Sequence, residues 1–118
     1  MQTVNIQKVP NQSFSITIES VSYDFEIATF KDITYVSVTI DGENVVNSYR
    51  CVNNGLVIPF PFMQKKGKGN FIFFDTNGDY PNYKNFGDSC NLYYFSLNEM
   101  IELYLSKKNR ENAQHQGA

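Results

Sequence analysis

The 118-residue sequence is poor in the residues that build metal sites and nucleophilic active sites. It has no tryptophan, a single histidine at His115, and two isolated cysteines, Cys51 and Cys90. A zinc site takes its ligands mainly from cysteine and histidine, often as a closely spaced cysteine pair, and neither cysteine belongs to such a pair. We therefore expect no metal, no other cofactor and no Cys–His nucleophile. We interpret both cysteines as small, partly buried, reduced thiols.

Positive charge is also scarce. The chain has 10 lysines and arginines against 12 aspartates and glutamates, for a net charge of -2, and only two of the cations are arginines, Arg50 and Arg110. A nucleic-acid-binding protein needs a concentrated cationic surface to release the counterions of the phosphates. The single basic cluster, at 65–68, is short and is typical of a solvated loop between strands. Nucleic acid is therefore excluded as the main partner.

Long apolar runs are missing as well. No stretch of the sequence approaches the roughly 18 consecutive apolar residues that a membrane-spanning helix requires, so we expect no membrane span. The residues at 1–6 have neither the basic segment nor the apolar segment of a secretory signal, and we expect synthesis in a cytoplasm without export.

Good helix formers are few and strand formers are many. Leucine and alanine together number 8, whereas valine, isoleucine, threonine, tyrosine and phenylalanine together number 42. This composition excludes a helical bundle and predicts an all-β protein, a small antiparallel β-barrel or sandwich. The length fits one β-domain, at 1–105, followed by a polar tail at 106–118 that we expect to be disordered.

The first half of the chain alternates apolar and polar residues with the period of a half-buried strand. Such runs occur at 14–19, 23–30 and 34–40, with short connections at 20–22 and at 31–32. Asp41-Gly42 then separates the third run from a fourth at 43–49. Because Asp-Gly accommodates positive φ angles, we expect a two-residue hairpin here and a β-meander over the first 50 residues.

The second half is less regular. Pro59 and Pro61 make the apolar stretch at 56–63 an edge segment or an extended loop, because proline donates no ladder hydrogen bond. The continuous apolar run at 71–74 indicates a strand buried on both faces or closed inside a barrel, and 91–97 forms the last strand. Asn98 is predicted to cap a short helix over 99–105. The apolar stripe of that helix comprises Met100, Ile101, Tyr104 and Leu105.

One short motif resembles the opening of a calcium-binding EF-hand loop. Asp75, Asn77 and Asp79 supply oxygen ligands at its first, third and fifth positions. Tyr80 replaces the glycine needed at the sixth position, and Phe86 replaces the closing glutamate at the twelfth. We therefore predict no specific calcium site. We interpret the segment as a turn in which Asn77-Gly78 adopts positive φ and Asp75 caps local amides.

Aromatic residues in polar loops are the candidate binding residues. Either such rings cover the ends of the core, or they anchor a partner protein, and the sequence leaves both interpretations open. Carbohydrate stacking is a further alternative, although tryptophan, its favoured platform, is absent. The candidate partner-binding residues are Phe60, Phe62, Tyr80, Tyr83 and Phe86.

Three segments of this sequence resemble the small baseplate plug proteins of contractile-tailed bacteriophages, a family named for a cyanophage plug. Members show a Gln-x-Phe-x-Val/Ile-x-Leu/Ile opening, a Phe-Asp-Thr-x-Gly-Asp motif and a closing Leu-Tyr-Tyr strand. The corresponding residues here are at 12–18, 74–79 and 92–94. The resemblance covers roughly 8–100.

This resemblance implies a compact all-β barrel or sandwich with a structural role. The chain would be a virion protein of the tail baseplate, made in the host cytoplasm, that binds the hub, tube or spike and catalyses nothing. The segment at 52–69 and the chain after Leu97 depart from the family pattern. Two alternatives stay open: assembly into a homo-oligomer, and a β-rich module that binds carbohydrate or protein through its loop aromatics.

Overall fold

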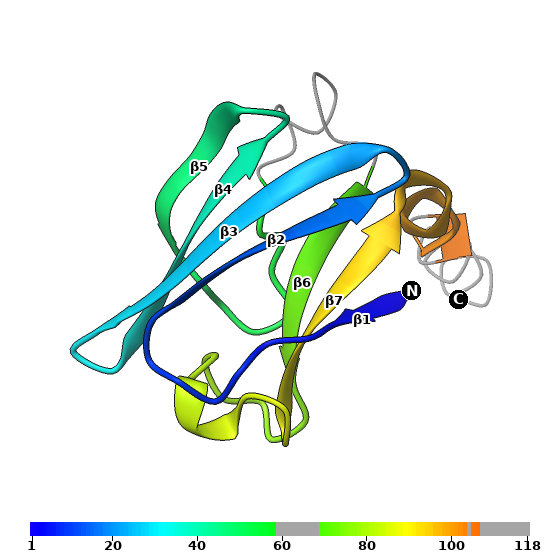
Figure 1. The fold of residues 1–118 in the computed structure, drawn as a ribbon. Helices are drawn as coiled ribbons and strands as arrows, with labels where there is room; N and C mark the ends of the chain where they lie inside the picture. The colour runs from blue at the N-terminus through cyan, green and yellow to red at the C-terminus, as the bar shows by residue number, and fades with distance from the viewer. Residues whose placement is uncertain (59–68, 104, 107–118) are drawn as a thin grey trace, which may run out of the picture.

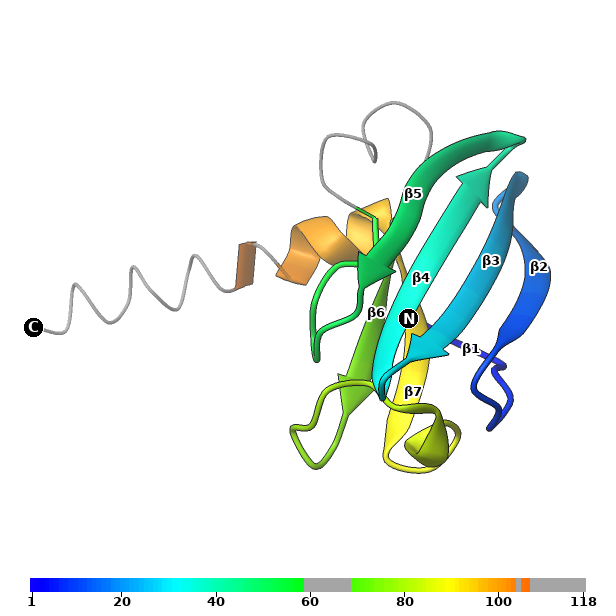
Figure 2. The same ribbon diagram turned by 90° about the vertical axis from the view of Figure 1, so that its left-hand side faces the viewer.

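The computed structural model describes residues 1–58, 69–103 and 105–106, and within them two antiparallel sheets pack face to face (Figures 1 and 2). The strands are β1 (Gln2–Val4), β2 (Gln12–Ile18), β3 (Val21–Phe30), β4 (Ile33–Ile40), β5 (Glu43–Arg50), β6 (Gly69–Asp75) and β7 (Cys90–Ser96). One sheet has the order β1-β7-β6 and the other the order β2-β3-β4-β5. The all-β prediction is confirmed, and its form is a sandwich rather than a closed barrel.

The four-stranded sheet is a meander built on three two-residue hairpin turns. Both residues of each turn have positive φ, as a type I′ turn requires. The turns are Glu19-Ser20, Lys31-Asp32 and Asp41-Gly42. The hairpin at Asp41-Gly42 is confirmed, with Ile40 paired to Glu43 across it. The predicted connection at 20–22 is wrong, because Ile18 already pairs with Val21 and β3 begins there.

The three-stranded sheet joins distant parts of the chain. β7 lies between β6 and β1, so that Leu92 pairs with Phe73 on one side and with Val4 on the other. Residues 54–57 lie alongside the free edge of β6, where the Val57 N–H donates to the C=O of Phe71 at 2.9 Å. The described part of the apolar stretch at 56–63 is therefore an edge segment, as predicted, and 59–63 lies outside the described residues.

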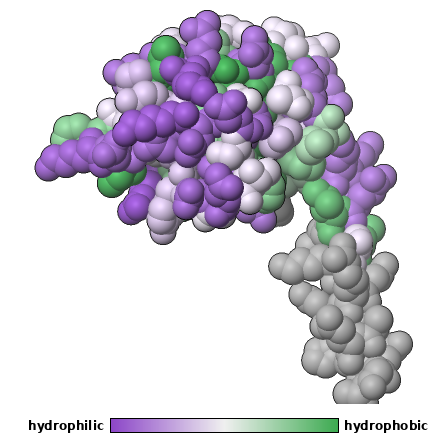
Figure 3. Space-filling view, turned by 90° about the horizontal axis from the view of Figure 1, so that it is seen from below, coloured by the Kyte–Doolittle hydropathy of each residue, from purple (hydrophilic) through white to green (hydrophobic). Residues whose placement is uncertain are grey.

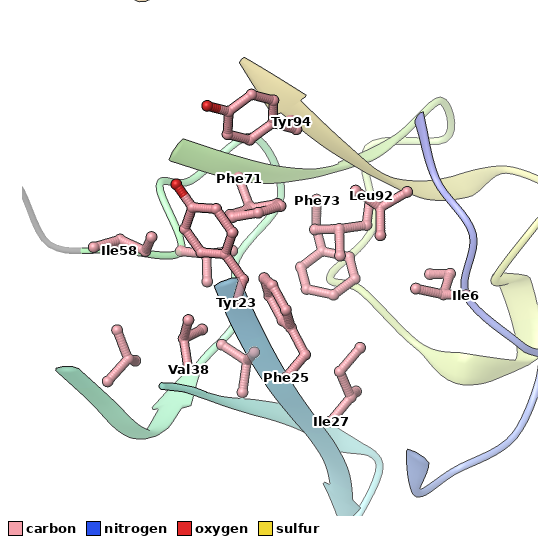
Figure 4. Close-up of a cluster of buried hydrophobic side chains, with 14 of the residues drawn as sticks. Ile6, Tyr23, Phe25, Ile27, Val38, Ile58, Phe71, Phe73, Leu92 and Tyr94 are labelled. Atoms are coloured by element: carbon pink, nitrogen blue, oxygen red, sulfur yellow. The ribbon is translucent and has the colours of Figure 1, made fainter. Parts of the chain in front are cut away.

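The core fills the space between the two sheets. Alternate residues of β2, β3, β4, β6 and β7 point inward, as the period-2 pattern predicts, whereas β5 buries only Val46. Its centre is a cluster of rings in edge-on or tilted contact, in which Phe71 lies 5.0 Å from Tyr23, 4.6 Å from Phe25 and 5.1 Å from Tyr94 between ring centroids (Figure 4). Aromatic pairs at such distances add to the stability that burial provides.

A helical segment, residues 97–103 and 105–106, follows β7 directly and projects from the sandwich (Figure 2). Its cap is Ser96, not the predicted Asn98. The Glu99 main chain donates to the Ser96 hydroxyl at 3.2 Å, and the Ser96 main chain donates to the Glu99 carboxylate at 3.0 Å. This reciprocal pair is a capping box, which uses the Ser-x-x-Glu spacing at 96–99. No helix in the described part of the chain is long and apolar enough to span a membrane.

Candidate protein-docking surfaces

The loop between β6 and β7 carries three of the predicted partner-binding rings and exposes only one of them fully. Tyr80 is 63% exposed, and the Arg50 guanidinium lies 5.0 Å from its ring centroid. Such a cation–π contact positions the ring without covering it. Tyr80 is therefore the loop aromatic that is available to a partner.

Tyr83 and Phe86 face the core instead. Tyr83 opens the short 3₁₀ helix η1 (Tyr83–Asn85), is half-buried and packs against the core. Phe86 is 1% exposed and stacks on Phe73 with 5.8 Å between ring centroids. The structure thus separates the two interpretations of these rings: Phe86 covers the end of the core, and a partner cannot reach its ring. Phe60 and Phe62 lie outside the described residues.

In the loop whose sequence resembles the start of an EF-hand, the Asp75 carboxylate is engaged in hydrogen bonds within the loop. Asp75 is buried, and its carboxylate accepts from the main-chain N–H of Asn77 at 2.7 Å and from the Ser89 hydroxyl at 3.4 Å. Gly78 has the predicted positive φ, at 77°, whereas Asn77 does not, so only the glycine half of that prediction is confirmed. The bond from the Asn77 main chain confirms the capping role of Asp75. In the described ranges, His, Cys, Asp and Glu form no cluster of three or more that could hold a metal ion.

A second surface, which the sequence did not indicate, lies on the outer face of the three-stranded sheet. It consists of Ile72, Phe74, Tyr93 and Phe95, and we call it the aromatic sheet face. Phe74 is 42% exposed and the other three are half-buried. The expectation that the strand at 71–74 is buried on both faces is wrong, because only Phe71 and Phe73 point into the sandwich. A hollow of about 230 Å³ on this face is lined by Met1, Asn54 and all four residues.

Apolar side chains continue from this face onto the helical segment. A second hollow, of about 290 Å³, joins Phe95 to Leu103 and to the carboxylates Glu99 and Glu102. The predicted stripe of the helix is not buried as a unit: Met100 packs against the core, whereas Ile101 and Leu105 are 46% and 51% exposed and Tyr104 lies outside the described residues. Figure 3, which views the end that carries the β6–β7 loop, shows a mostly hydrophilic surface with hydrophobic side chains gathered where the helical segment leaves the sandwich.

The two cysteines are buried free thiols. Burial and the neighbouring Cys90 raise the pKa of the Cys51 thiol to about 12. Burial and the charge of Asp75 raise the pKa of the Cys90 thiol to about 11. Because the thiolate is the reactive form, both side chains serve packing and not nucleophilic chemistry at neutral pH.

Comparison with known proteins decides the family. The family model described as "Cyanophage baseplate Pam3 plug gp18" matches residues 1–98 of this chain. The chain belongs to the cyanophage baseplate plug family. No curated protein matches the sequence.

The plug-family match covers every described strand and ends in the first turn of the helical segment. The three family motifs therefore have structural places. The opening motif is β2, the Phe-Asp-Thr-x-Gly-Asp motif is the end of β6 with its turn, and Leu-Tyr-Tyr is the centre of β7. The helical segment beyond residue 98 lies outside the part that this plug protein shares with its family.

Proposed function

We propose that this plug-family chain is a structural subunit of a phage tail baseplate that binds neighbouring tail proteins, the hub, tube or spike, and has no enzymatic activity. The observation that carries the proposal is the family match over 1–98, which includes the whole sandwich. The virion is then the place where the protein works, after synthesis in the host cytoplasm.

The surface chemistry supports contact with other proteins. Contiguous exposed apolar side chains mark interaction sites in small soluble domains. The aromatic sheet face supplies such a patch, extended by the exposed leucines and isoleucine of the helical segment: Leu97, Ile101, Leu103 and Leu105. Tyr80 supplies a separate aromatic contact from the β6–β7 loop. With one exposed ring among the three in this loop, a carbohydrate platform has less support than a protein interface.

The function is tested by the presence of the chain in virions, and two single variants test which surface docks. Phe74→Ala and Tyr80→Ala each remove an exposed ring, so each should leave the melting temperature nearly unchanged. We expect incorporation into purified tail particles, measured by quantitative mass spectrometry, to fall about tenfold or more for at least Phe74→Ala.

The matched control is Phe30→Ala, which removes a ring that is 63% exposed at the end of β3 and does not belong to the aromatic sheet face. It should retain wild-type stability and wild-type incorporation. If the unsubstituted chain is missing from virions purified from the phage that encodes it, the proposed function is wrong. If Phe74→Ala is incorporated normally, the function stands and the aromatic sheet face is not the docking surface.

A further inference from the structure

The outer edge of β2 is long and regular, and no described residue pairs with it. β2 pairs with β3 over all seven residues, from Gln12 with Ile27 to Ile18 with Val21, without a register shift. It contains neither a proline nor a charged residue. Soluble proteins usually protect a sheet edge with such residues, with a bulge or with a covering segment. β2 has none of these devices among the described residues.

The other edges of the sandwich are protected or short. β5 shows register shifts against β4 and a left-handed residue, Ser48, with a φ of 49°. The outer edge of β6 is covered by residues 54–57, and β1 has only three residues. β2 is therefore the one described edge that offers a full strand for pairing.

The hairpin geometry determines which main-chain groups of β2 point outward. Ile18 and Val21 flank a two-residue turn and bond to each other, so alternate residues of β2 bond to β3 and the residues between them do not. Ser22, the partner of Thr17, confirms which residues alternate in this way. Its N–H donates to the Asp41 side chain and its C=O accepts from the Asp41 N–H, each at 2.9 Å, so both groups point away from β2. The N–H and C=O groups of Ser13, Ser15 and Thr17 therefore point away from the sheet.

The sandwich is also open beside this edge. Phe14 and Ile16 point inward from β2 yet are only half-buried, whereas their partners on β3, Phe25 and Tyr23, are fully buried. A hollow of about 530 Å³ lies between the end of β2 and β1 and is lined by Thr17, Ile18 and Glu19, by Met1 and Gln2, and by Tyr94. The Tyr94 hydroxyl donates to the Glu19 carboxylate at 3.3 Å. β1 and β2 belong to different sheets and do not pair with each other; Figure 1 shows their two ribbons. An added strand would have backbone partners on β2 and apolar side chains to cover.

Charge indicates what kind of strand fits. The outer face of the sheet next to β2 carries Asp24 and Glu26 on β3, and β2 and β3 contain no lysine or arginine. Neither carboxylate forms an ion pair with a described residue. An added strand would lie about 9–10 Å from β3, two strand spacings away, which is within reach of long basic side chains. A second copy of β2 would bring no cation to this face.

We propose that the outer edge of β2 binds an extended segment of a partner protein by strand addition, and that this segment alternates basic side chains on its outer face with apolar side chains on its inner face. Main-chain hydrogen bonds to Ser13, Ser15 and Thr17 supply affinity, and the basic residues opposite Asp24 and Glu26 supply register. Only the identification of the partner as a tail protein rests on the proposed function.

The first test measures the backbone directly. Hydrogen exchange of the peptide that covers 12–18 is compared between the free protein and tail particles purified from the phage that encodes it. In the free protein, the amides of Ser13, Ser15 and Thr17 should exchange quickly, and in the particle they should become protected. If the chain is present in the particle and these amides still exchange quickly, the strand-addition proposal fails while the proposed function stands.

The second test removes one donor without touching the β2–β3 ladder. Ser15→Pro deletes an N–H that points outward, and Ser15→Val is the matched control because both variants lose the hydrogen bond from the Ser15 hydroxyl to Asp24. We expect Ser15→Pro to reduce incorporation into particles about tenfold or more relative to Ser15→Val. Equal incorporation of the two variants would overturn the proposal.

A third variant keeps the proposal testable if Ser15→Pro does not fold. The double change Asp24→Asn with Glu26→Gln should reduce incorporation, whereas Asp32→Asn with Asp88→Asn, the same loss of charge at exposed sites elsewhere, should not. Equal effects of the two double variants would refute the proposal that the added strand carries basic side chains opposite Asp24 and Glu26. A dimer of the free protein in sedimentation velocity that Ser15→Pro dissociates would also overturn it, because the occupant would then be a second copy.

Discussion

At the scale of single residues, the side chain of Asn70 makes the two hydrogen bonds to Ile58 that a main-chain partner would make in a β-ladder. Its side-chain oxygen accepts from the N–H of Ile58 at 2.9 Å, and its side-chain amide donates to the C=O of Ile58 at 2.7 Å. The Asn70 side chain thus occupies the place of a neighbouring peptide unit. It holds Ile58 beside the start of β6.

We predict that Asn70→Ala lowers the free energy of unfolding by about 2–4 kcal/mol, because two buried main-chain groups lose their partners. Chemical denaturation measures the loss. Asn44→Ala is the control, since the Asn44 amide donates to the C=O of Val46 at 3.2 Å on an exposed strand, and it should cost less than about 1 kcal/mol. Equal losses would show that burial of the Asn70 pair does not matter.

The buried thiols predict a second effect, on the pH dependence of stability. The pKa values of Cys51 and Cys90 in the folded protein, about 12 and about 11, lie above the ordinary value of roughly 8.5 that applies in the unfolded chain. The unfolded chain therefore releases these protons first as the pH rises. The contribution of the neutral thiols is complete below about pH 8.5 and is lost as the pH approaches the folded values.

Thermal melts at pH 7.5 and pH 10.5 check this prediction. The melting temperature should fall between the two values, and the fall should be smaller in the double variant Cys51→Ala with Cys90→Ala, which lacks the thiols. Tyrosine and lysine titration is common to both proteins and cancels in the comparison. An identical fall in both proteins would show that the thiols do not contribute.

At the scale of elements, the hairpin turns show how far local sequence determines local structure. Asp41-Gly42 combines the residue pair that tolerates positive φ with a side chain that accepts a hydrogen bond from Ser22, and it was predictable. Glu19 and Ser20 adopt the same geometry at φ angles of 52° and 66° without such residue types. Their conformation follows from the pairing of β2 with β3, which no local signal contains.

We predict that Gly42→Val lowers the free energy of unfolding by about 1–2 kcal/mol, because a β-branched residue resists the φ of 86° found there. No atom lies within 4 Å of a Cβ built at this position, so the cost comes from the backbone and not from a clash. Gly42→Asn is the control and should cost clearly less, since asparagine tolerates positive φ. Equal costs in urea denaturation would contradict the backbone explanation.

The docking surfaces were harder to predict than the strands. Periodicity located every strand of the meander to within a few residues, because one buried face imposes strict alternation. The run at 71–74 shows no alternation of apolar and polar residues, because the outward-facing Ile72 and Phe74 are as apolar as the buried Phe71 and Phe73. Only the tertiary structure distinguishes an outward ring from an inward one in such a strand. The same limit applies to Phe86, whose burial depends on Phe73 and not on its polar loop.

At the scale of the whole molecule, the sequence predicted the fold class but not the assembly of the sheets. It left barrel and sandwich open, because the pairing of β1 with β7 links residues about ninety positions apart, from Gln2 with Tyr94 to Val4 with Leu92. The family motifs fall on β2, β6 and β7. The resemblance, like the periodicity, left barrel and sandwich open.

We predict that deleting residues 107–118, the part of the predicted polar tail beyond the described helix, leaves a cooperative melt within about 2 °C of the full chain. These residues have no apolar periodicity and no aromatic side chain with which to cover the sandwich. Calorimetry of the shortened protein measures the effect. Loss of the cooperative transition would place the tail within the folded domain.

The pairing of the chain's first strand with its last also has a consequence for folding on the ribosome. Strands β2 to β5 meet neighbours in sequence through two-residue turns, so their contacts are local and can form as the chain emerges. β1 is synthesised first, yet it pairs only with β7, which is synthesised last among the strands. The contacts of the meander can therefore form before β7 has been made, whereas β1 must wait for β7 before it enters the three-stranded sheet.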